Sequence, residues 1–450
     1  MLILTINSGS SSVKFQVYDW EQADVLAVGV IERIGQHGTR LKYKAHMQRV
    51  TEYVTCASAR EAVDIICRQI CAPEVGVVSS LEEIGAVGHR VSHGGEHFTR
   101  SCLVDDEVVR RLKEIQRMAP LHLPANIAGI ETARERMPGI PHAIVVDTAW
   151  HQTMGPAAFM YAVPRSWYTE HHVRRYGFHG TSFLYCAKRA AALLHRESRE
   201  LNAIICHVGN GSSVCAVREG ISYDTSMGLT PQEGLIMGTR CGDIDPSVIP
   251  YMMRQTGWSA EKVDIALNRE SGLQGICGHM DRRDIMEEAS KGDDLSRLAI
   301  DMESYRLKKY IGAYMAALGR VDALVFTAAA GEMSALLRSR CLGGLENFGI
   351  IVDPEKNRIC RSRNAEFDIS APESRVRILV IPTDEEMVIT EDTWALVQGR
   401  YNGQPAYRYT FEDRGYINKG RLRAFALDLE KEPALSSILA DPETFWSTMS

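Results

Sequence analysis

Asn7-Ser8-Gly9-Ser10-Ser11-Ser12-Val13-Lys14 lies between two apolar runs, and His207-Val208-Gly209-Asn210-Gly211-Ser212-Ser213-Val214 lies between two more, far along the chain. A Gly/Ser turn between apolar strands predicts a β-hairpin. Small residues at such a bend let several backbone N–H groups point at one anion, and serine hydroxyls add donors. The repeated pattern predicts two related halves that hold two phosphates of one nucleotide, with two ordinary hairpins as the alternative.

Composition places the chain among globular proteins and limits its partners. It has 450 residues, 45% of them hydrophobic and 24% charged, which is enough for two or three domains. A net charge of -6 and the lack of any Lys/Arg run give no reason to expect nucleic acid or a membrane surface as partner. We expect no membrane span, and residues 1–6 to be a strand rather than a signal peptide. Eleven cysteines without metal or CxxC spacing indicate free thiols in a reducing cytoplasm.

Strand-like apolar runs alternate with helical patterns, which favours an α/β architecture. Strands are expected at 2–6, 13–18, 143–146, 203–206, 214–217, 323–326 and 378–381, and helices at 59–70, 105–118, 124–137, 182–197, 296–318 and 386–397. We expect an N-terminal domain of residues 1–148 plus about 383–398, and a C-terminal domain of residues 149–382. Residues 399–450 are rich in aromatic side chains, so we expect a docked extension of unknown role.

The segment from Asp224 to Pro246 is too rich in glycine, proline and hydroxyl residues for a regular helix or strand. A long irregular loop inside a compact domain is usually functional or disordered. Arg240 within it is a candidate donor to phosphate or carboxylate, because its guanidinium presents a fork of N–H groups. The alternative is a structural arginine that braces Asp243 or Asp245.

Four shorter segments also place polar side chains beside glycine or proline: 88–96 with Arg90, 121–124 with His122, 146–151 with Asp147, and 176–182 with His179. Taken alone, each has a structural explanation, such as a hydrogen-bonded core histidine or a helix-capping aspartate. Asp147 follows a strand, where α/β proteins commonly place site residues. The chain lacks the P-loop, protein-kinase and Gly-x-Ser-x-Gly motifs, so a bound nucleotide needs another scaffold.

Taken in their order along the chain, from residue 2 to about 395, these segments and Pro382-Thr-Asp-Glu-Glu386 resemble the acetokinase (acetate kinase) family of the acetate and sugar kinase/actin superfamily. The resemblance implies duplicated ribonuclease-H-like domains around a central cleft, in a cytoplasmic homodimer. It implies reversible, Mg²⁺- or Mn²⁺-dependent transfer of the ATP γ-phosphate to acetate, giving acetyl phosphate and ADP. The alternatives are a kinase for propionate or another short carboxylate, or a catalytically weakened regulatory relative.

The resemblance also implies a role for each matching residue. Arg90 would hold the substrate carboxylate, while Asp147, His179 and Arg240 would be catalytic. Leu121, Phe178 and Pro231 would line the acyl site, and Asn7 and Glu385 would bind the metal. Nucleotide contacts are implied for Lys14, His207, Val208, Gly209, Asn210, Gly211, Asp281, Arg282, Arg283, Ala329, Ala330, Gly331, Glu332 and Met333.

Several positions depart from the family pattern. Ala329 replaces a glycine of the nucleotide loop, where the backbone can require a positive φ or a close approach to the nucleoside, and Met333 replaces an asparagine. These two changes put the base preference and affinity in question. Ser92 stands where the acyl site usually has valine, which predicts a larger or more polar site. Phe183 and Leu123 replace a histidine and an asparagine.

Overall fold

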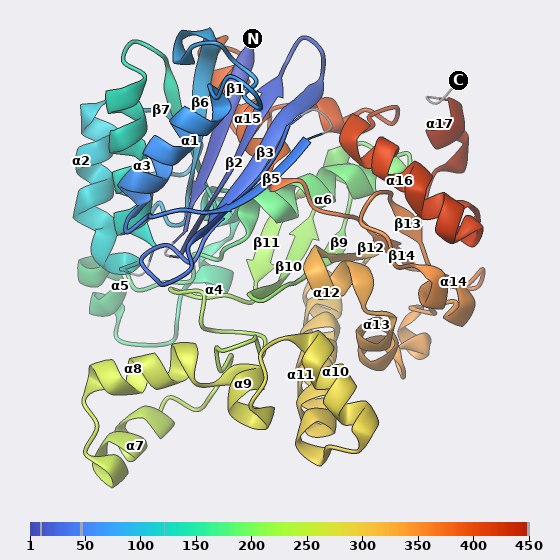
Figure 1. Cartoon of the computed structure of the whole chain (residues 1–450). Helices are drawn as coiled ribbons and strands as arrows, with labels where there is room; N and C mark the ends of the chain where they lie inside the picture. The colour runs from blue at the N-terminus through green and yellow to red at the C-terminus, as the bar shows by residue number, and fades with distance from the viewer. Residues whose placement is uncertain (10, 46–47, 121, 448–450) are drawn as a thin grey trace. The chain divides into compact units, whose positions relative to one another are not determined.

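The chain forms two compact units in the computed structural model, which describes residues 1–9, 11–45, 48–120 and 122–447 (Figure 1). The first unit comprises Met1–Gln152, Asp384–Tyr409 and Asn418–Gly420. The second comprises Thr153–Thr383, Thr410–Ile417 and Arg421–Ser450. The domain limits expected from the sequence stay a prediction.

An eight-stranded mixed sheet forms the centre of the first unit. Its order is β5-β4-β3-β2-β1-β6-β8-β7. The strands are β1 (Leu2–Ser8), β2 (Ser12–Asp19), β3 (Asp24–Glu32), β4 (Arg40–Ala45), β5 (Gln48–Tyr53), β6 (Ile84–Val91), β7 (Cys102–Leu103) and β8 (His142–Val146). Strands β1, β6 and β8 are parallel, whereas β1 to β5 form an antiparallel meander.

Helices cover both faces of this sheet: α1 (Ala59–Ile70), α2 (Asp106–Ile115), α3 (Leu123–Arg136) and α15 (Glu385–Val397). Successive side chains of a strand point to opposite faces. Leu4 and its neighbour Val87 therefore join the core that contains α1, while the adjacent Gly88 faces α15. A Cβ at Gly88 would lie 2.4 Å from Thr393 Oγ1 of α15, so only glycine permits this approach.

The second unit contains a six-stranded sheet with the order β11-β10-β9-β12-β14-β13. Its strands are β9 (Ala203–Val208), β10 (Ser212–Arg218), β11 (Ile221–Thr225), β12 (Ala323–Thr327), β13 (Phe367–Asp368) and β14 (Arg377–Val380). The first three strands in this order are antiparallel, and the third of them, β9, is also parallel to β12 and β14. A two-residue antiparallel strand closes the edge, and the same pattern occurs in β3-β2-β1-β6-β8-β7. This common order confirms the predicted α/β fold built from two related halves.

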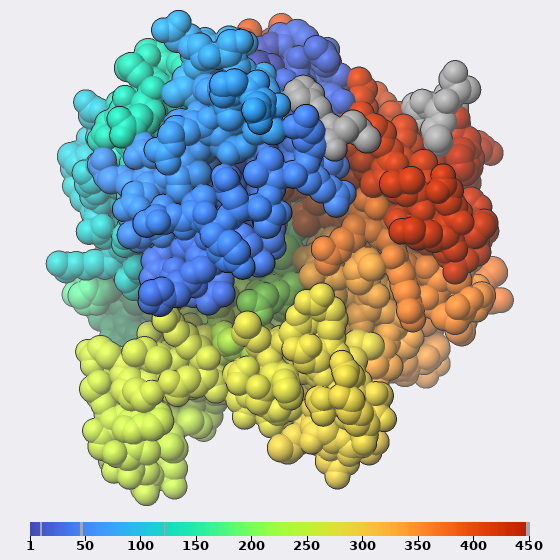
Figure 2. Space-filling view, in the orientation of Figure 1, coloured from blue at the N-terminus to red at the C-terminus, as the bar shows by residue number. Residues whose placement is uncertain are grey.

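Helices α6 (Gly180–Leu193) and α11 (Asp294–Leu318) cover opposite faces of the second sheet. The remaining helices of this unit are α4 (Pro156–Phe159), α5 (Arg165–His171), α7 (Val248–Thr256), α8 (Ala260–Arg269), α9 (Gly272–Cys277), α10 (Arg282–Lys291), α12 (Ala328–Met333), α13 (Ala335–Leu342), α14 (Pro354–Ile359), α16 (Lys419–Lys431, entering it at Arg421) and α17 (Pro442–Ser447). Helices α7 and α8 project as a lobe of their own (Figure 2). Across the described residues, no helix is long and apolar enough to cross a membrane.

The strands and helices expected from the sequence are confirmed, with shifts at their ends. The helix expected at 105–118 ends at Ile115 and continues as a 3-10 turn, and the helix expected at 182–197 runs from Gly180 to Leu193. The extension is ordered, because Phe425 of α16 joins the core of the second unit with Leu435 and Ile438. Figure 2 shows α16, in red, on the surface of the molecule.

Candidate active site

The first Gly/Ser turn joins β1 to β2, which confirms the predicted hairpin, with Asn7 paired to Lys14 across it. Helix α3 packs directly on this turn. The Asn126 side-chain amide donates to the carbonyl oxygen of Ser8, and its own oxygen accepts from the Ser92 N–H and hydroxyl at 3.0 Å. Asn126 thus ties the turn to the strand that carries Arg90.

Arg90 lies near the end of β6 and binds a buried carboxylate. Its Nε donates to Asp147 Oδ1 at 2.9 Å and its Nη2 donates to Asp147 Oδ2, while Nη1 donates to Asn7 Oδ1 at 3.2 Å. Asp147 follows β8 and its side chain is 1% exposed. Although burial opposes it, the carboxylates of Asp147 and Glu385 raise the pKa of Arg90. Three candidate residues from three strand ends therefore meet in the first unit.

Glu385 is the first residue of α15, and the Asp384 side chain caps this helix by accepting from the Met387 N–H at 3.1 Å. Burial raises the pKa of the Glu385 carboxyl to about 7. Arg90 opposes this rise, whereas the charges of Asp147 and Glu386 add to it. A buried carboxyl crowded by other carboxylates is readily stabilised by a cation.

Asn7, Arg90, Asp147 and Glu385 make up the half-site of the first unit, and its oxygen donors fit a magnesium ion. Among the described residues no group of three or more His, Cys, Asp or Glu side chains is arranged to hold a metal. Magnesium commonly uses only one or two carboxylates together with substrate phosphates and water. The Asn7 amide oxygen and the Glu385 carboxylate are donors of the required kind.

The second Gly/Ser turn joins β9 to β10 and is also a hairpin, as predicted. Gly209 N–H donates to the Gly211 carbonyl at 3.1 Å. Arg282 supports the turn from α10, because its Nη1 donates to the Gly209 carbonyl at 2.7 Å and its Nε to Glu303 at 2.8 Å. In this structure Arg282 therefore shapes the loop that is expected to hold phosphate.

His179 and His207 are held with defined ring positions. The two rings stack with centroids 4.0 Å apart. His179 Nδ1 lies 2.8 Å from Ser213 Oγ, and His207 Nδ1 lies 2.8 Å from Ser182 Oγ. His179 has a φ of 58°, a left-handed conformation that is uncommon for a residue with a side chain and that places it just before α6.

Arg240 lies beside this turn without a carboxylate partner. Its Nη1 donates to the Pro231 carbonyl at 3.2 Å, and no acidic side chain of the described chain lies within ion-pair distance. The alternative of a brace to Asp243 or Asp245 is wrong, because Asp243 binds Tyr310 and Arg306 while Asp245 accepts from the Ser247 N–H. Burial lowers the pKa of Arg240.

The turn, His179 and Arg240 share one small volume. A Cβ added at Gly211 would lie 3.5 Å from both Arg240 Nη1 and His179 Nε2. An anion at this place would meet a guanidinium, an imidazole and the backbone of a glycine turn. Phe178, which precedes His179 in the chain, is buried in a cluster with Met227 and Met237.

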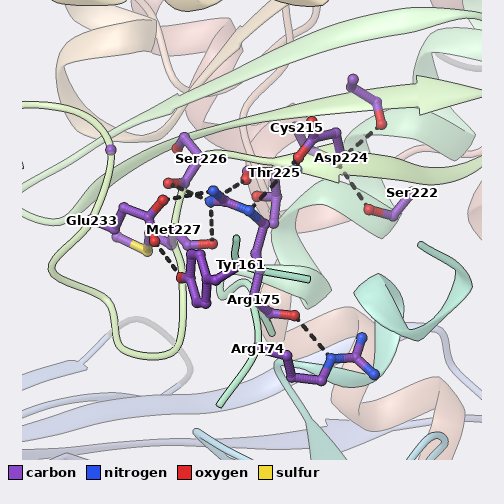
Figure 3. Close-up of polar contacts among 12 residues, drawn as sticks. Tyr161, Arg174, Arg175, Cys215, Ser222, Asp224, Thr225, Ser226, Met227 and Glu233 are labelled. Atoms are coloured by element: carbon purple, nitrogen blue, oxygen red, sulfur yellow. Dashed lines mark hydrogen bonds and ion pairs between the residues drawn. The ribbon is translucent and has the colours of Figure 1, made fainter. Parts of the chain in front are cut away.

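The irregular loop that carries Pro231 is fastened by Arg175 (Figure 3). Arg175 Nη1 donates to the carbonyls of Thr225, Ser226 and Met227, and Nη2 donates to Glu233 at 2.6 Å. The Tyr161 hydroxyl donates to the same Glu233 carboxylate. The loop is irregular as predicted, and one half-buried arginine fixes both of its arms.

The family of the chain follows from comparison with known proteins. The model of the acetokinase family matches residues 2–391. The chain belongs to the acetokinase family. It is 52% identical over 442 residues to the acetate kinase of Treponema pallidum, covering 98% of this chain and 99% of the relative.

Solved structures agree with this membership. The acetate kinase of Porphyromonas gingivalis superposes with a TM-score of 0.83 at 40% identity, covering 88% of this chain and 99% of that one. A propionate kinase from Francisella tularensis gives 0.82 at 39% identity, with the same coverage.

The nucleotide loop expected from the acetokinase pattern forms the short helix α12. The positive φ of 62° belongs to Ala328 and not to Ala329, so a positive φ at Ala329 is not found, whereas a close approach of Ala329 to the nucleoside stays a prediction. Ala329 is exposed within the helix, and Met333 is 39% exposed. Burial raises the pKa of Glu332, and Arg363 lies 3.3 Å from its carboxylate.

The structure gives the remaining candidate residues fewer contacts with the residues described above. Asp281 caps α10 and pairs with Arg283, and the Arg283 side chain is 88% exposed. Leu121 lies outside the described residues. Ser92 is buried, but its hydroxyl is turned to Asn126.

Sequence reasoning missed four residues that hold the candidate site residues of the two units in place: Asn126, Arg175, Glu233 and Glu303. Each acts through another residue across a long sequence separation, and local composition carries no signal of such pairing. Only Glu233 lay inside a segment that its glycine and proline content had singled out.

Proposed function

We propose that the protein is an acetate kinase that reversibly transfers the ATP γ-phosphate to acetate, with Mg²⁺ or Mn²⁺. The observation that carries this proposal is Arg240, a half-buried guanidinium with no carboxylate partner in the described chain, beside the Gly211 backbone and His179. A desolvated positive charge is stabilised by an anion. Membership of the acetokinase family supports a phosphoryl group as that anion.

The chemistry explains why such residues suffice. Acetate is ionised at neutral pH, so its oxygen attacks the γ-phosphorus without a strong general base while the bond to the ADP oxygen breaks. The main obstacle is the approach of two anions, and charge neutralisation and positioning lower it. In our proposal Arg240 and His179 stabilise the oxygens of the transferring group.

The first unit would hold the carboxylate and the metal. Arg90 offers the fork that suits a carboxylate, and Asp147 fixes its orientation. Asn7 and Glu385 would hold Mg²⁺, which when bound would neutralise phosphate charge. Lys14, the 207–211 turn, residues 281–283 and residues 329–333 remain our candidates for ATP contacts.

The proposal is tested by trapping acyl phosphate as the hydroxamate, with ATP, Mg²⁺ and a panel of carboxylates. We expect acetate to give the highest kcat/KM. A preference for propionate would assign the activity named for the Francisella relative, and Ser92 is the residue that suggests it. Absence of product with every acid would support the regulatory alternative.

Arg240→Ala tests the residue that carries the proposal. We expect kcat to fall by about 100-fold or more, the scale for losing a donor to transition-state charge, while ATP affinity changes little. Arg269→Ala, at an exposed position of α8, is the matched control and should leave kcat unchanged. Equal losses of kcat and ATP affinity would contradict the role given to Arg240.

We also propose a homodimer in the cytoplasm. Leu295, Leu298, Met302 and Tyr305 are exposed along one face of α11, and a second copy of this chain would cover them. The eleven free cysteines fit a reducing compartment. Light scattering should give a dimer mass for the wild type and a monomer mass for Leu298→Glu. A wild-type monomer would contradict the dimer.

A further inference from the structure

The C-terminal extension contacts the segment that leads into Glu385. The family model ends at residue 391, whereas the alignment with the Treponema pallidum relative covers 98% of the chain and so includes most of the extension. Within the first unit, the Asn418 side-chain amide donates to Asp384 Oδ2 at 2.8 Å. The other oxygen of Asp384 caps α15. Asn418 therefore orients the carboxylate that begins the helix of Glu385.

Arg421 holds the residues just before this cap. Within the second unit, its Nη1 donates to the Pro382 carbonyl at 2.7 Å and its Nη2 to the Thr383 carbonyl at 2.5 Å. The positive charge of Arg421 also acts on Glu332 of α12. A planar guanidinium with two acceptors on consecutive carbonyls fixes the direction of the backbone more tightly than one bond would.

A second part of the extension holds the middle of α15. Asp392 is fully buried and accepts from the Tyr409 hydroxyl at 2.7 Å and from Ser101 Oγ at 2.6 Å. Tyr407 packs against Tyr409 with ring centroids 4.8 Å apart. The helix is thus contacted by the extension at its first turn and again two turns later.

We propose that the extension is a positioning element for the metal half-site, in which Asn418 and Arg421 set the placement of Glu385. This inference rests on the proposed function, because it takes Glu385 as a metal-binding carboxylate. Residues that orient a metal ligand through a hydrogen bond affect metal affinity without touching the ion. Neither residue is a catalytic residue, since each acts through the backbone or through Asp384.

The test compares Asn418→Ala and Arg421→Gln with Arg408→Gln, an exposed arginine of the same extension that serves as the matched control. In the metal-free protein, we expect faster amide hydrogen exchange at residues 384–388 in the two variants and not in the control. The Mg²⁺ concentration for half-maximal hydroxamate formation should rise by about 10-fold, the lower end for an outer-shell partner, while KM for acetate is unchanged. Arg421→Lys should restore part of the effect.

Wild-type exchange at residues 384–388, or an unchanged Mg²⁺ dependence in both variants, would overturn the inference. Asn418→Asp gives a further check, because it sets a second carboxylate against Asp384 and should exceed the effect of alanine. Glu385→Gln separates this inference from the proposed function. If Glu385→Gln shifts the Mg²⁺ dependence and the extension variants do not, only the inference fails. If Glu385→Gln leaves it unchanged, the metal role of Glu385 fails.

Discussion

Two arginines with similar predicted roles have opposite surroundings. Arg90 is paired with the Asp147 carboxylate, whereas Arg240 has only neutral acceptors among the described residues. A substrate anion at Arg90 therefore competes with an internal carboxylate, while one at Arg240 does not. This difference fits our proposal, in which Arg240 stabilises charge that develops during transfer and Arg90 orients the acceptor.

The Arg90–Asp147 pair can be tested by a double-mutant cycle. Arg90→Ala leaves a buried carboxylate without its guanidinium and should lower the free energy of unfolding by about 3 kcal/mol. Asp147→Ala should cost a similar amount, and the double variant less than the sum, because neither charge is then left alone. Urea unfolding of the four proteins measures the coupling. Strict additivity would show that the pair contributes nothing beyond its separate members.

At this scale the sequence singled out the candidate residues, whose roles stay predictions, but gave no signal of their partners. Arg90, Asp147, His179 and Arg240 stand out because glycine, proline or a strand end lies beside them. Their partners could not be predicted, since Asn126 meets Ser92 and Arg175 meets Glu233 only after distant segments pack together. The positive φ considered for Ala329 belongs to the preceding Ala328, because composition does not specify φ.

At the scale of elements, the irregular loop after β11 depends on the brace formed by Tyr161, Arg175 and Glu233. Tyr161→Phe removes a donor to Glu233 and the acceptor of the Leu229 N–H. We expect a loss of about 1–2 kcal/mol in unfolding free energy and faster amide exchange across residues 226–234. Tyr251→Phe on the exposed face of α7 is the control. Identical exchange in the two variants would show that the loop is held by other contacts.

The buried carboxyl of Asp392 in helix α15 should make the free energy of unfolding depend on pH. Burial raises the pKa of Asp392 to about 6, against the opposing hydrogen bonds of Ser101 and Tyr409. The folded state therefore binds a proton that the unfolded state releases, and this contribution is present below about pH 4 and is lost as the pH rises to about 6. The difference should reach about 3 kcal/mol at most.

Asp392→Asn isolates this contribution. We expect the wild type to lose stability relative to the variant between about pH 4 and pH 6, and the difference to stay constant above that range. Urea midpoints of both proteins at several pH values give the difference, in which other titrating groups cancel. A difference that is flat with pH, or that rises in favour of the wild type, would contradict the raised pKa.

At the scale of the whole molecule, two related halves were predictable because two hairpins with similar Gly/Ser turns are each followed by alternating strands and helices. Local periodicity also located most helices. The extension was harder to predict, since residues 399–416 lack any clear period and residues 422–439 have only a weak helical pattern. Its aromatic side chains indicated docking, but the residues that they contact are determined by tertiary packing. The Tyr409 hydroxyl donates to Asp392, and the ring centroids of Phe425 and Phe367 are 6.0 Å apart.

The extension should therefore contribute to the stability of the second unit as a core element. Phe425 is 1% exposed and packs in the core with Leu435, Ile438 and Phe367, so Phe425→Ala should lower the free energy of unfolding by about 3 kcal/mol or more. Leu427 lies on the same helix and is 57% exposed, so Leu427→Ala should change it by less than about 0.5 kcal/mol. Urea unfolding monitored by circular dichroism measures both. The two variants share a helix and differ in the burial of the replaced side chain. A small loss of unfolding free energy in both would show that α16 lies loosely on the surface. A large loss in both would show that helix propensity, rather than core packing, determines the contribution of α16.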